Sequence, residues 1–216
     1  IGKYASSLGY PGIAAKTILV PHPVPPVMTF HEGLKENVVL AVGRWEQSDA
    51  ALKDPDLLLT GLKFFLTSHP DWKAEIVGRG GMALASRCVD WSPQIRDRLI
   101  LKQALDREEL AQCYSRSKIL LCPSRFESFH ISSAEAVCCG CSLVVADHPL
   151  LASTAWFTSE NCGTLVSNRS ATELSAGLSK EADAWLTGRR HPIQISNYWS
   201  SLLHADRVAK RILEEA

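Results

Sequence analysis

Six short runs of apolar residues, most of them ended by a glycine or a proline, are the feature that most limits how this chain can fold. The runs at 17–21 and 38–42 are apolar at nearly every position, whereas a half-exposed strand would alternate apolar with polar residues. Continuous runs of this kind are typical of parallel strands that are covered on both faces. The predicted strands comprise residues 17–21, 38–42, 74–77, 98–101, 118–122 and 143–146.

Helical patterns separate these runs. Asp54 and Pro55 form a helix start, with Asp as the N-cap and Pro in the first turn, and leucine and phenylalanine then recur at helical spacing to about residue 69. Asp106 and Glu109 have the spacing of a capping box. Further helices are expected after the strand at 118–122, at 171–185 and at 193–215. Strands that alternate with helices predict a doubly wound, mostly parallel, Rossmann-like α/β sheet.

The composition is that of an ordinary globular protein. The 216 residues include 23 basic and 23 acidic ones, so the charge gives no reason to expect nucleic-acid binding. No apolar run is long enough to span a bilayer, and seven cysteines in apolar runs suit buried, reduced thiols, so we expect a cytoplasmic protein. The chain begins with Ile1, and we expect it to be a fragment of a longer protein.

In a parallel α/β sheet, ligands bind beyond the carboxyl ends of the strands. Three predicted loops meet at that edge, at residues 43–44, 78–81 and 123–130. Glu127 lies in the last of them, and Glu135 follows eight positions later, inside the next helix. Carboxylates accept hydrogen bonds from neighbouring hydroxyls, as in a sugar or a ribose.

The same edge suits an anion. The free amides at the start of the helix, near residues 129–132, and the positive end of the helix dipole favour a phosphate, and Arg44 would add a guanidinium. Hydroxyl-binding carboxylates beside an anion site point to a nucleotide sugar.

Residues 125–146, with Glu127 and Glu135 separated by seven residues and followed by Ala136 and Gly140, resemble the E-x7-E segment of retaining GT-B glycosyltransferases. The similarity is to the glycogen-synthase-like and mannosyltransferase-like group. Residues 42–44 look like the diphosphate-binding "GR" of that family, and residues 76–80 look like its glycine-rich turn. The resemblance extends from about residue 16 to the C-terminal helix.

The resemblance implies a role for each matching residue. Arg44 and Lys53 would hold the diphosphate of the donor, with Gly43, Gly78 and Gly80 in the adjoining turns. No metal and no cofactor is implied, because two cations and a helix N-terminus can neutralise a nucleoside diphosphate leaving group. The donor would be a UDP- or GDP-linked sugar, and residues 102–104 would lie along its base.

Glu135 would accept hydrogen bonds from the ribose. Glu127, as the catalytic carboxylate, and the backbone of Phe129, His130 and Ile131 would hold the transferred sugar and the distal phosphate. The family usually has glycine at positions 128 and 130, where this chain has Ser128 and His130.

The resemblance also implies a domain plan. Residues 1–30 would form a linker, a first strand and a crossing segment, residues 31–190 the nucleotide-sugar-binding domain, and residues 191–216 a C-terminal helix that packs toward an N-terminal, acceptor-binding domain absent from this chain. The acceptor glycan, lipid or small molecule, and any peripheral membrane contact, would belong to that missing half. The isolated chain would then be an inactive part of a hexosyltransferase.

Other hypotheses fit parts of the sequence. Glu127 alone would suit a solvated loop carboxylate, Lys53 an exposed lysine, and His130 a polar loop residue. A glycosidase pair is disfavoured, because Glu135 lies on a buried helix and the Arg44 anion site would be unexplained. A zinc site at Cys138, Cys139 and Cys141 is disfavoured, because Cys138 and Cys139 would point to different faces of a helix. The competing function is a non-catalytic nucleotide-sugar-binding module, or one subunit of a split transferase.

Overall fold

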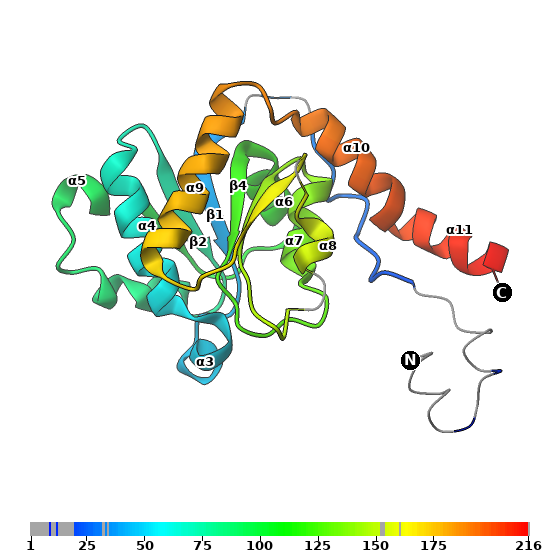
Figure 1. Cartoon of the computed structure of the whole chain (residues 1–216), viewed down its shortest axis with the longest axis horizontal. Helices are drawn as coiled ribbons and strands as arrows, with labels where there is room; N and C mark the ends of the chain where they lie inside the picture. Colours follow the sequence, from blue (N-terminus) through cyan, green and yellow to red (C-terminus); the bar gives the residue numbers. More distant parts are fainter. Residues whose placement is uncertain are drawn as a thin grey trace.

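The computed structural model describes residues 9, 12, 20–31, 33, 35–151, 154–159 and 161–215. Most of the strand expected at 17–21, and most of the linker before it, lie outside the described residues. Six parallel strands form one sheet in the order β3-β2-β1-β4-β5-β6 (Figure 1). They are β1 (Glu36–Val42), β2 (Lys73–Val77), β3 (Leu99–Lys102), β4 (Ser117–Cys122), β5 (Ser142–Ala146) and β6 (Gly163–Val166).

Helices cover both faces of the sheet, so the predicted doubly wound α/β fold is confirmed. On one face lie α4 (Pro55–Ser68) and α9 (Ala171–Leu186), which pack against each other. On the other face lie α6 (Arg107–Arg116), α7 (Ile131–Cys138) and α10 (Pro192–Leu203). Short helical segments fill the connections: η1 (Gln47–Asp49), α3 (Ala50–Lys53), η2 (Gly81–Arg87), α5 (Pro93–Arg96) and α8 (Thr154–Phe157).

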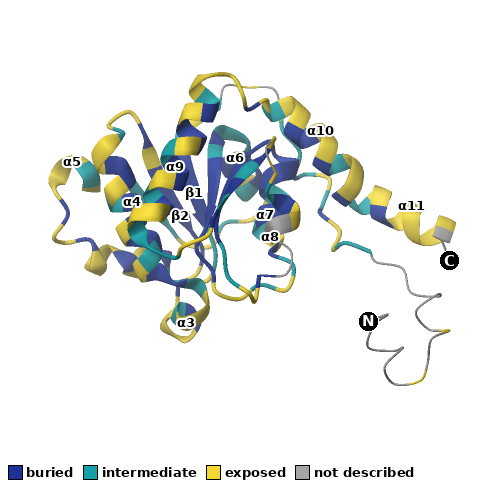
Figure 2. Cartoon of the chain, in the orientation of Figure 1, coloured by how far each residue is buried: buried dark blue, intermediate teal, exposed yellow. Residues whose placement is uncertain are grey.

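The strands are mostly buried (Figure 2), and their apolar side chains belong to two hydrophobic layers, one on each face of the sheet. Val39 and Ile119 join the layer under α4 and α9, while Leu40 and Leu120 join the layer under α6, α7 and α10. Successive residues of a strand point to opposite faces, so a strand between two helical layers must be apolar at every position. This burial on both faces explains the continuous apolar runs.

The predicted helix at 193–215 is wrong as a single element. It is divided into α10 and α11 (Ala205–Glu215), because His204 leaves the helical conformation with ψ of 142°. Val24, from the proline-rich segment, pairs with the break: its amide donates to the carbonyl of Leu203 at 2.8 Å, and its carbonyl accepts from the amide of Ala205 at 3.0 Å. A segment distant in the sequence thus provides hydrogen-bond partners for the carbonyl and the amide that the break leaves without helical partners. Of the helices that the structure describes, none combines the length and the apolar character that a membrane crossing requires.

The strand order places a topological switch point between β1 and β4. From β1 the chain winds outward through β2 to β3, and it then returns through α6 to β4 on the other side of β1. The connections on the two sides of this point diverge, which opens a crevice beyond the carboxyl ends of β1 and β4. The fold therefore identifies one place where a ligand is expected.

Candidate functional site

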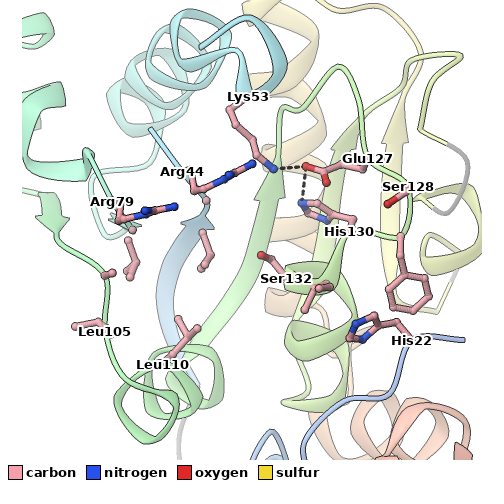
Figure 3. Close-up of a pocket in the computed structure, with 17 residues that line it drawn as sticks. His22, Arg44, Lys53, Arg79, Leu105, Leu110, Glu127, Ser128, His130 and Ser132 are labelled. Atoms are coloured by element: carbon pink, nitrogen blue, oxygen red, sulfur yellow. Dashed lines mark hydrogen bonds and ion pairs between the residues drawn. The ribbon is translucent and has the colours of Figure 1, made fainter. Parts of the chain in front are cut away.

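A hollow of about 430 Å³ lies at the switch point, and loops that follow four strands line it (Figure 3). The loops follow β1, β2, β3 and β4, and α7 begins at its edge. The residues that line it are His22, Val42, Gly43, Arg44, Lys53, Val77, Gly78, Arg79, Ala104, Leu105, Leu110, Glu127, Ser128, Phe129, His130, Ile131 and Ser132. Eight of the ten residues expected at the site are in this set, and Gly80 and Glu135 are not among the described lining residues.

Lys53 and Glu127 form an ion pair inside the hollow (Figure 3). Lys53 is the last residue of α3, and Glu127 lies in the loop after β4. The two side chains are each 15% exposed. The amide of Arg125 donates to the carbonyl of Leu52 at 2.7 Å, so the backbone also holds the two segments together. The fold thus brings together a cation and a carboxylate that the sequence separates by 74 positions.

His130 occupies the N-cap of α7 with φ of 57°, in the left-handed region. A side chain at such φ is disfavoured, so a glycine, the residue usual at this position in the resembling family, would fit the backbone without strain. The imidazole is buried: its Nδ1 lies 2.5 Å from Ser133 Oγ, and its Nε2 lies 3.8 Å from Glu127 Oε1. Burial lowers the pKa of His130 to about 4, although Glu127 acts to raise it, so the ring is neutral near pH 7.

Two arginines complete the cationic side of the hollow. Arg44 follows β1, is 56% exposed at its side chain and pairs with Asp49 at 3.1 Å. Arg79 follows β2 and also lines the hollow (Figure 3). Sequence reasoning missed Arg79, because the surrounding glycines indicated only a turn. Its position directly after a strand, like that of Arg44, could have indicated that it lies at the site. Together with Lys53 and the start of α7, these side chains suit an anion.

The glycines at the strand ends allow the loops to approach one another. A Cβ on Gly78, whose φ is 134°, would lie 1.7 Å from the carbonyl oxygen of Gly43. A Cβ on Gly80 would lie 2.8 Å from backbone atoms of Trp45 and Glu46. Gly43 and Gly78 line the hollow, whereas Gly80 packs beneath the loop after β1. These contacts explain why the loop after β2 needs glycine at positions 78 and 80.

The opposite wall of the hollow is aromatic and apolar. Phe129 stacks on His22, with ring centroids 5.8 Å apart, and Ile131 is 45% exposed at the first position of α7. No described side chain caps α7, so its first amides are available to a ligand. Sequence reasoning missed His22, because the proline-rich segment that carries it has no local pattern that indicates a site.

Glu135 lies behind the start of α7. Its carboxylate accepts a hydrogen bond from the hydroxyl of Tyr114 at 3.0 Å, and Tyr114 is fully buried in α6. Burial raises the pKa of the Glu135 carboxyl, and the Tyr114 hydrogen bond only partly offsets that shift. A carboxylate that is held by a tyrosine and poorly hydrated is a strong acceptor for another hydroxyl.

The thiols and histidines give no metal centre within the described part of the chain. All seven cysteines are described, and each is buried as a free thiol. Burial raises the pKa of Cys138 to about 12, so this thiol stays protonated at neutral pH. No group of three or more His, Cys, Asp or Glu side chains among the described residues could hold a metal ion.

The fold has structural relatives among solved proteins. A mutant of TarM from S. aureus, in complex with fondaparinux, alpha-GlcNAc-glycerol and UDP, superposes with a TM-score of 0.74 at 14% identity, over 92% of this chain and 39% of that one. Sucrose-phosphate synthase from Thermosynechococcus elongatus superposes with a TM-score of 0.70 at 18% identity, and the match covers 92% of this chain and 51% of that one. HepE from Anabaena, in complex with UDP and glucose, superposes with a TM-score of 0.67 at 16% identity, and the match covers 98% of this chain and 60% of that one. These similarities establish the fold as a Rossmann-like domain of the GT-B architecture.

Sequence comparison agrees with the fold. The chain is 29% identical over 155 residues to the D-inositol 3-phosphate glycosyltransferase of Xylanimonas cellulosilytica, and this match covers 63% of the chain. The chain spans about a third of the length of that relative, since the match covers 33% of it. Residues 30–191 match the family profile described as glycosyl transferases group 1. This profile extends over most of the sequence, and all the residues that line the hollow except His22 lie within it. The chain therefore belongs to the group 1 glycosyl transferase family.

Proposed function

We propose that this chain is the donor-binding half of a retaining glycosyltransferase, which transfers a sugar from a nucleoside-diphosphate sugar to an acceptor hydroxyl without a metal ion. The observation that carries the proposal is the joint position of Lys53 and Glu127 at the switch point, beside the start of α7. A cation for the diphosphate and a carboxylate for the sugar hydroxyls thus lie within one hollow.

The cations of the hollow would neutralise the negative charge of the leaving group. As the glycosidic bond breaks, negative charge grows on the diphosphate, and Arg44, Lys53 and the amides of Ile131 and Ser132 would stabilise it. Arg79 would extend this surface toward the distal phosphate. Side chains held in place before the reaction can provide this stabilisation without a metal ion, which is the basis for proposing metal independence.

The remaining walls suit the nucleoside and the sugar. Ala104, Leu105 and Leu110 form an apolar wall on the β3 side, where the base would lie. Glu135, behind the start of α7, would accept hydrogen bonds from the ribose. Glu127 would bind the transferred sugar, with His130 and Phe129 beside it. Retention rests on the resemblance of residues 125–146 to the E-x7-E segment.

Under this proposal the donor half would be one part of a longer enzyme. The chain spans 39% to 60% of the solved relatives named above, so the acceptor, whether glycan, lipid or small molecule, would bind largely through a further domain. A cytoplasmic location, and a membrane contact through that domain, belong to the same proposal.

Titration of the chain with UDP, GDP and their sugar adducts, in the presence of EDTA, tests the proposal. We expect saturable binding of one nucleotide series, and weaker binding to a Glu135→Ala variant. The absence of saturable binding to both series would overturn the proposed function. The anomeric configuration of the product made by the longer parent protein would test retention.

A second candidate is a binding module, or one subunit of a split transferase. The observation that favours it is His130, whose buried side chain occupies a left-handed position at which the resembling family usually has glycine. The two candidates differ in their response to the nucleotide sugar. A transferase in its full-length form would release the nucleoside diphosphate in the presence of acceptor, whereas a binding module would return the nucleotide sugar unchanged.

A further inference from the structure

Arg169 joins three segments and contacts the start of the loop that carries Glu127, although it is not one of the residues that line the hollow. It follows β6, and its side chain is 17% exposed. Its guanidinium donates to the carbonyls of Pro123 at 2.5 Å and Ser124 at 3.0 Å, at the end of β4, and to the carbonyl of Ala146 at 2.9 Å, at the end of β5. It also donates to Asp54 Oδ2 at 2.9 Å.

Asp54 is the chain neighbour of Lys53. It caps α4 by accepting from the amide of Leu57 at 3.4 Å, and its φ is 49°. Among the described residues, only Asp54 and His130 combine a side chain with positive φ, and both lie at helix starts beside the hollow. Left-handed residues other than glycine occur preferentially at functional sites, because they are kept only where the surroundings hold them.

The position of Asp54 creates an electrostatic conflict. Its carboxylate is largely buried, one position along the chain from the cation that would hold the diphosphate. If it were unpaired, it would attract Lys53 and repel the phosphates of the donor. Arg125 supplies one partner, at 2.8 Å, but that side chain is 55% exposed and therefore well screened by solvent. Arg169 is the better shielded of the two partners.

We infer that Arg169 is a positioning residue, which neutralises Asp54 so that this carboxylate neither adds to the competition for Lys53 nor repels the diphosphate of the donor. The inference rests on the proposed function. Burial acts to raise the pKa of Asp54, but hydrogen bonds from Arg169 and Arg125 outweigh burial and lower it, so the carboxylate is charged and its charge is paired. Arg169 also holds the end of β4, from which the loop to Glu127 starts.

A double-mutant cycle separates this role from a structural one. UDP and GDP are titrated against the unsubstituted chain, Arg169→Met, Asp54→Asn and the double variant, at low and high salt. Asparagine suits this test because it tolerates positive φ and caps helices while carrying no charge. We expect Arg169→Met to weaken binding about tenfold, more at low salt than at high salt, and Asp54→Asn to restore most of that loss in the double variant.

Arg190→Met is the matched control. Arg190 is another buried arginine, and it pairs with Glu181 at 2.7 Å at the far end of α9, away from the hollow. We expect this variant to lose stability without losing nucleotide affinity. Arg169→Gln, which removes the charge but keeps an amide that can donate to the backbone carbonyls, replaces Arg169→Met in the cycle if the methionine variant does not fold.

The outcomes distinguish the two proposals. The absence of saturable binding by the unsubstituted chain would overturn the proposed function, and this inference with it. Normal binding that is unchanged by Arg169→Met would overturn the inference alone. A loss that Asp54→Asn does not restore, and that does not depend on salt, would also overturn it, because Arg169 would then act only through the backbone.

Discussion

Lys53 Nζ and Glu127 Oε1 form an ion pair within the hollow between β1 and β4, where the diphosphate and the sugar of a donor are proposed to bind. Each side chain already has a partner of opposite charge. A diphosphate that approached Lys53 would therefore compete with Glu127 for the same ammonium group. The pair keeps both charges in place in the free chain, and it sets a free-energy cost on donor binding.

This competition predicts opposite effects for the two members of the pair. Glu127→Gln should tighten UDP or GDP binding about fivefold, because Lys53 no longer exchanges a charged partner for the diphosphate. Lys53→Met should weaken binding about tenfold, because the diphosphate loses a cation. Calorimetric titration of the nucleotide without its sugar measures both effects. Equal weakening by the two substitutions would mean that Glu127 supports the nucleotide site instead of competing for it.

The lowered pKa of His130 should make the free energy of unfolding depend on pH. Its pKa of about 4 in the folded chain lies below the ordinary value of 6.5, so the unfolded chain binds a proton between these values that the folded chain does not. Stability should therefore fall as the pH drops from 6.5 toward 4, by about 3 kcal/mol from this residue. His130→Asn, which tolerates the left-handed backbone, should make the loss between pH 7 and pH 5 smaller.

Urea unfolding at several pH values measures this effect. Carboxylates also titrate at the low end of the range, so the comparison is the difference between the variant and the unsubstituted chain at each pH. His31→Asn, at an exposed histidine, serves as the control and should leave the profile unchanged. Parallel profiles for the unsubstituted chain and His130→Asn would contradict the prediction.

The sequence was sufficient for the regular part of this fold. Strands β1, β2, β3, β4 and β5 lie within one or two residues of their predicted positions, because burial on both faces imposes a pattern that needs no tertiary information. The capping box at Asp106 and Glu109 is present, because it depends on residues three positions apart. Local chemistry determined these elements.

Elements set by distant contacts were missed. β6 is a four-residue strand that begins with Gly163, and it exists because it pairs with β5. The break at His204 has no glycine or proline to mark it, and it depends on Val24, far away in the sequence. At the site, the convergence of the loops followed from topology, whereas the Lys53–Glu127 pair and the contacts of Arg169 required the three-dimensional structure.

The close approach of Gly78 to the backbone of Gly43 predicts that a side chain at position 78 would destabilise the fold. Gly78→Ala should destabilise the chain by at least about 3 kcal/mol, because the new Cβ would overlap the carbonyl of Gly43 and φ is unfavourable. Gly188→Ala is the matched control: its φ of 69° is also positive, but no atom lies within 4 Å of the added Cβ. We expect a cost of about 1 kcal/mol there. Similar unfolding midpoints in urea for the two variants would show that conformational strain, and not the contact between the strand ends, makes glycine necessary at position 78.

Glu135 offers a test in which stability and function should move in opposite directions. Its pKa in the folded chain is raised by burial, so above the ordinary pKa of a glutamate the folded chain retains a proton that the unfolded chain releases. Stability from this residue therefore falls as the pH rises through that window, and it stays reduced at neutral pH. Glu135→Gln removes the charge and keeps an oxygen that can accept from Tyr114, so it should stabilise the chain by about 1 kcal/mol at pH 7.5.

The same substitution should weaken nucleotide binding, because a neutral amide is a poorer acceptor for the ribose hydroxyls than a carboxylate. Urea unfolding measures the first effect, and titration with UDP and 2′-deoxy-UDP, or with the guanosine pair, measures the second. The affinity lost through Glu135→Gln should be smaller for the deoxy nucleotide, which lacks one of the hydroxyls. Glu36→Gln, at an exposed position in β1, is the control for both measurements. A variant that gains stability and binds both nucleotides as the unsubstituted chain does would remove Glu135 from the site and leave it as a buried partner of Tyr114.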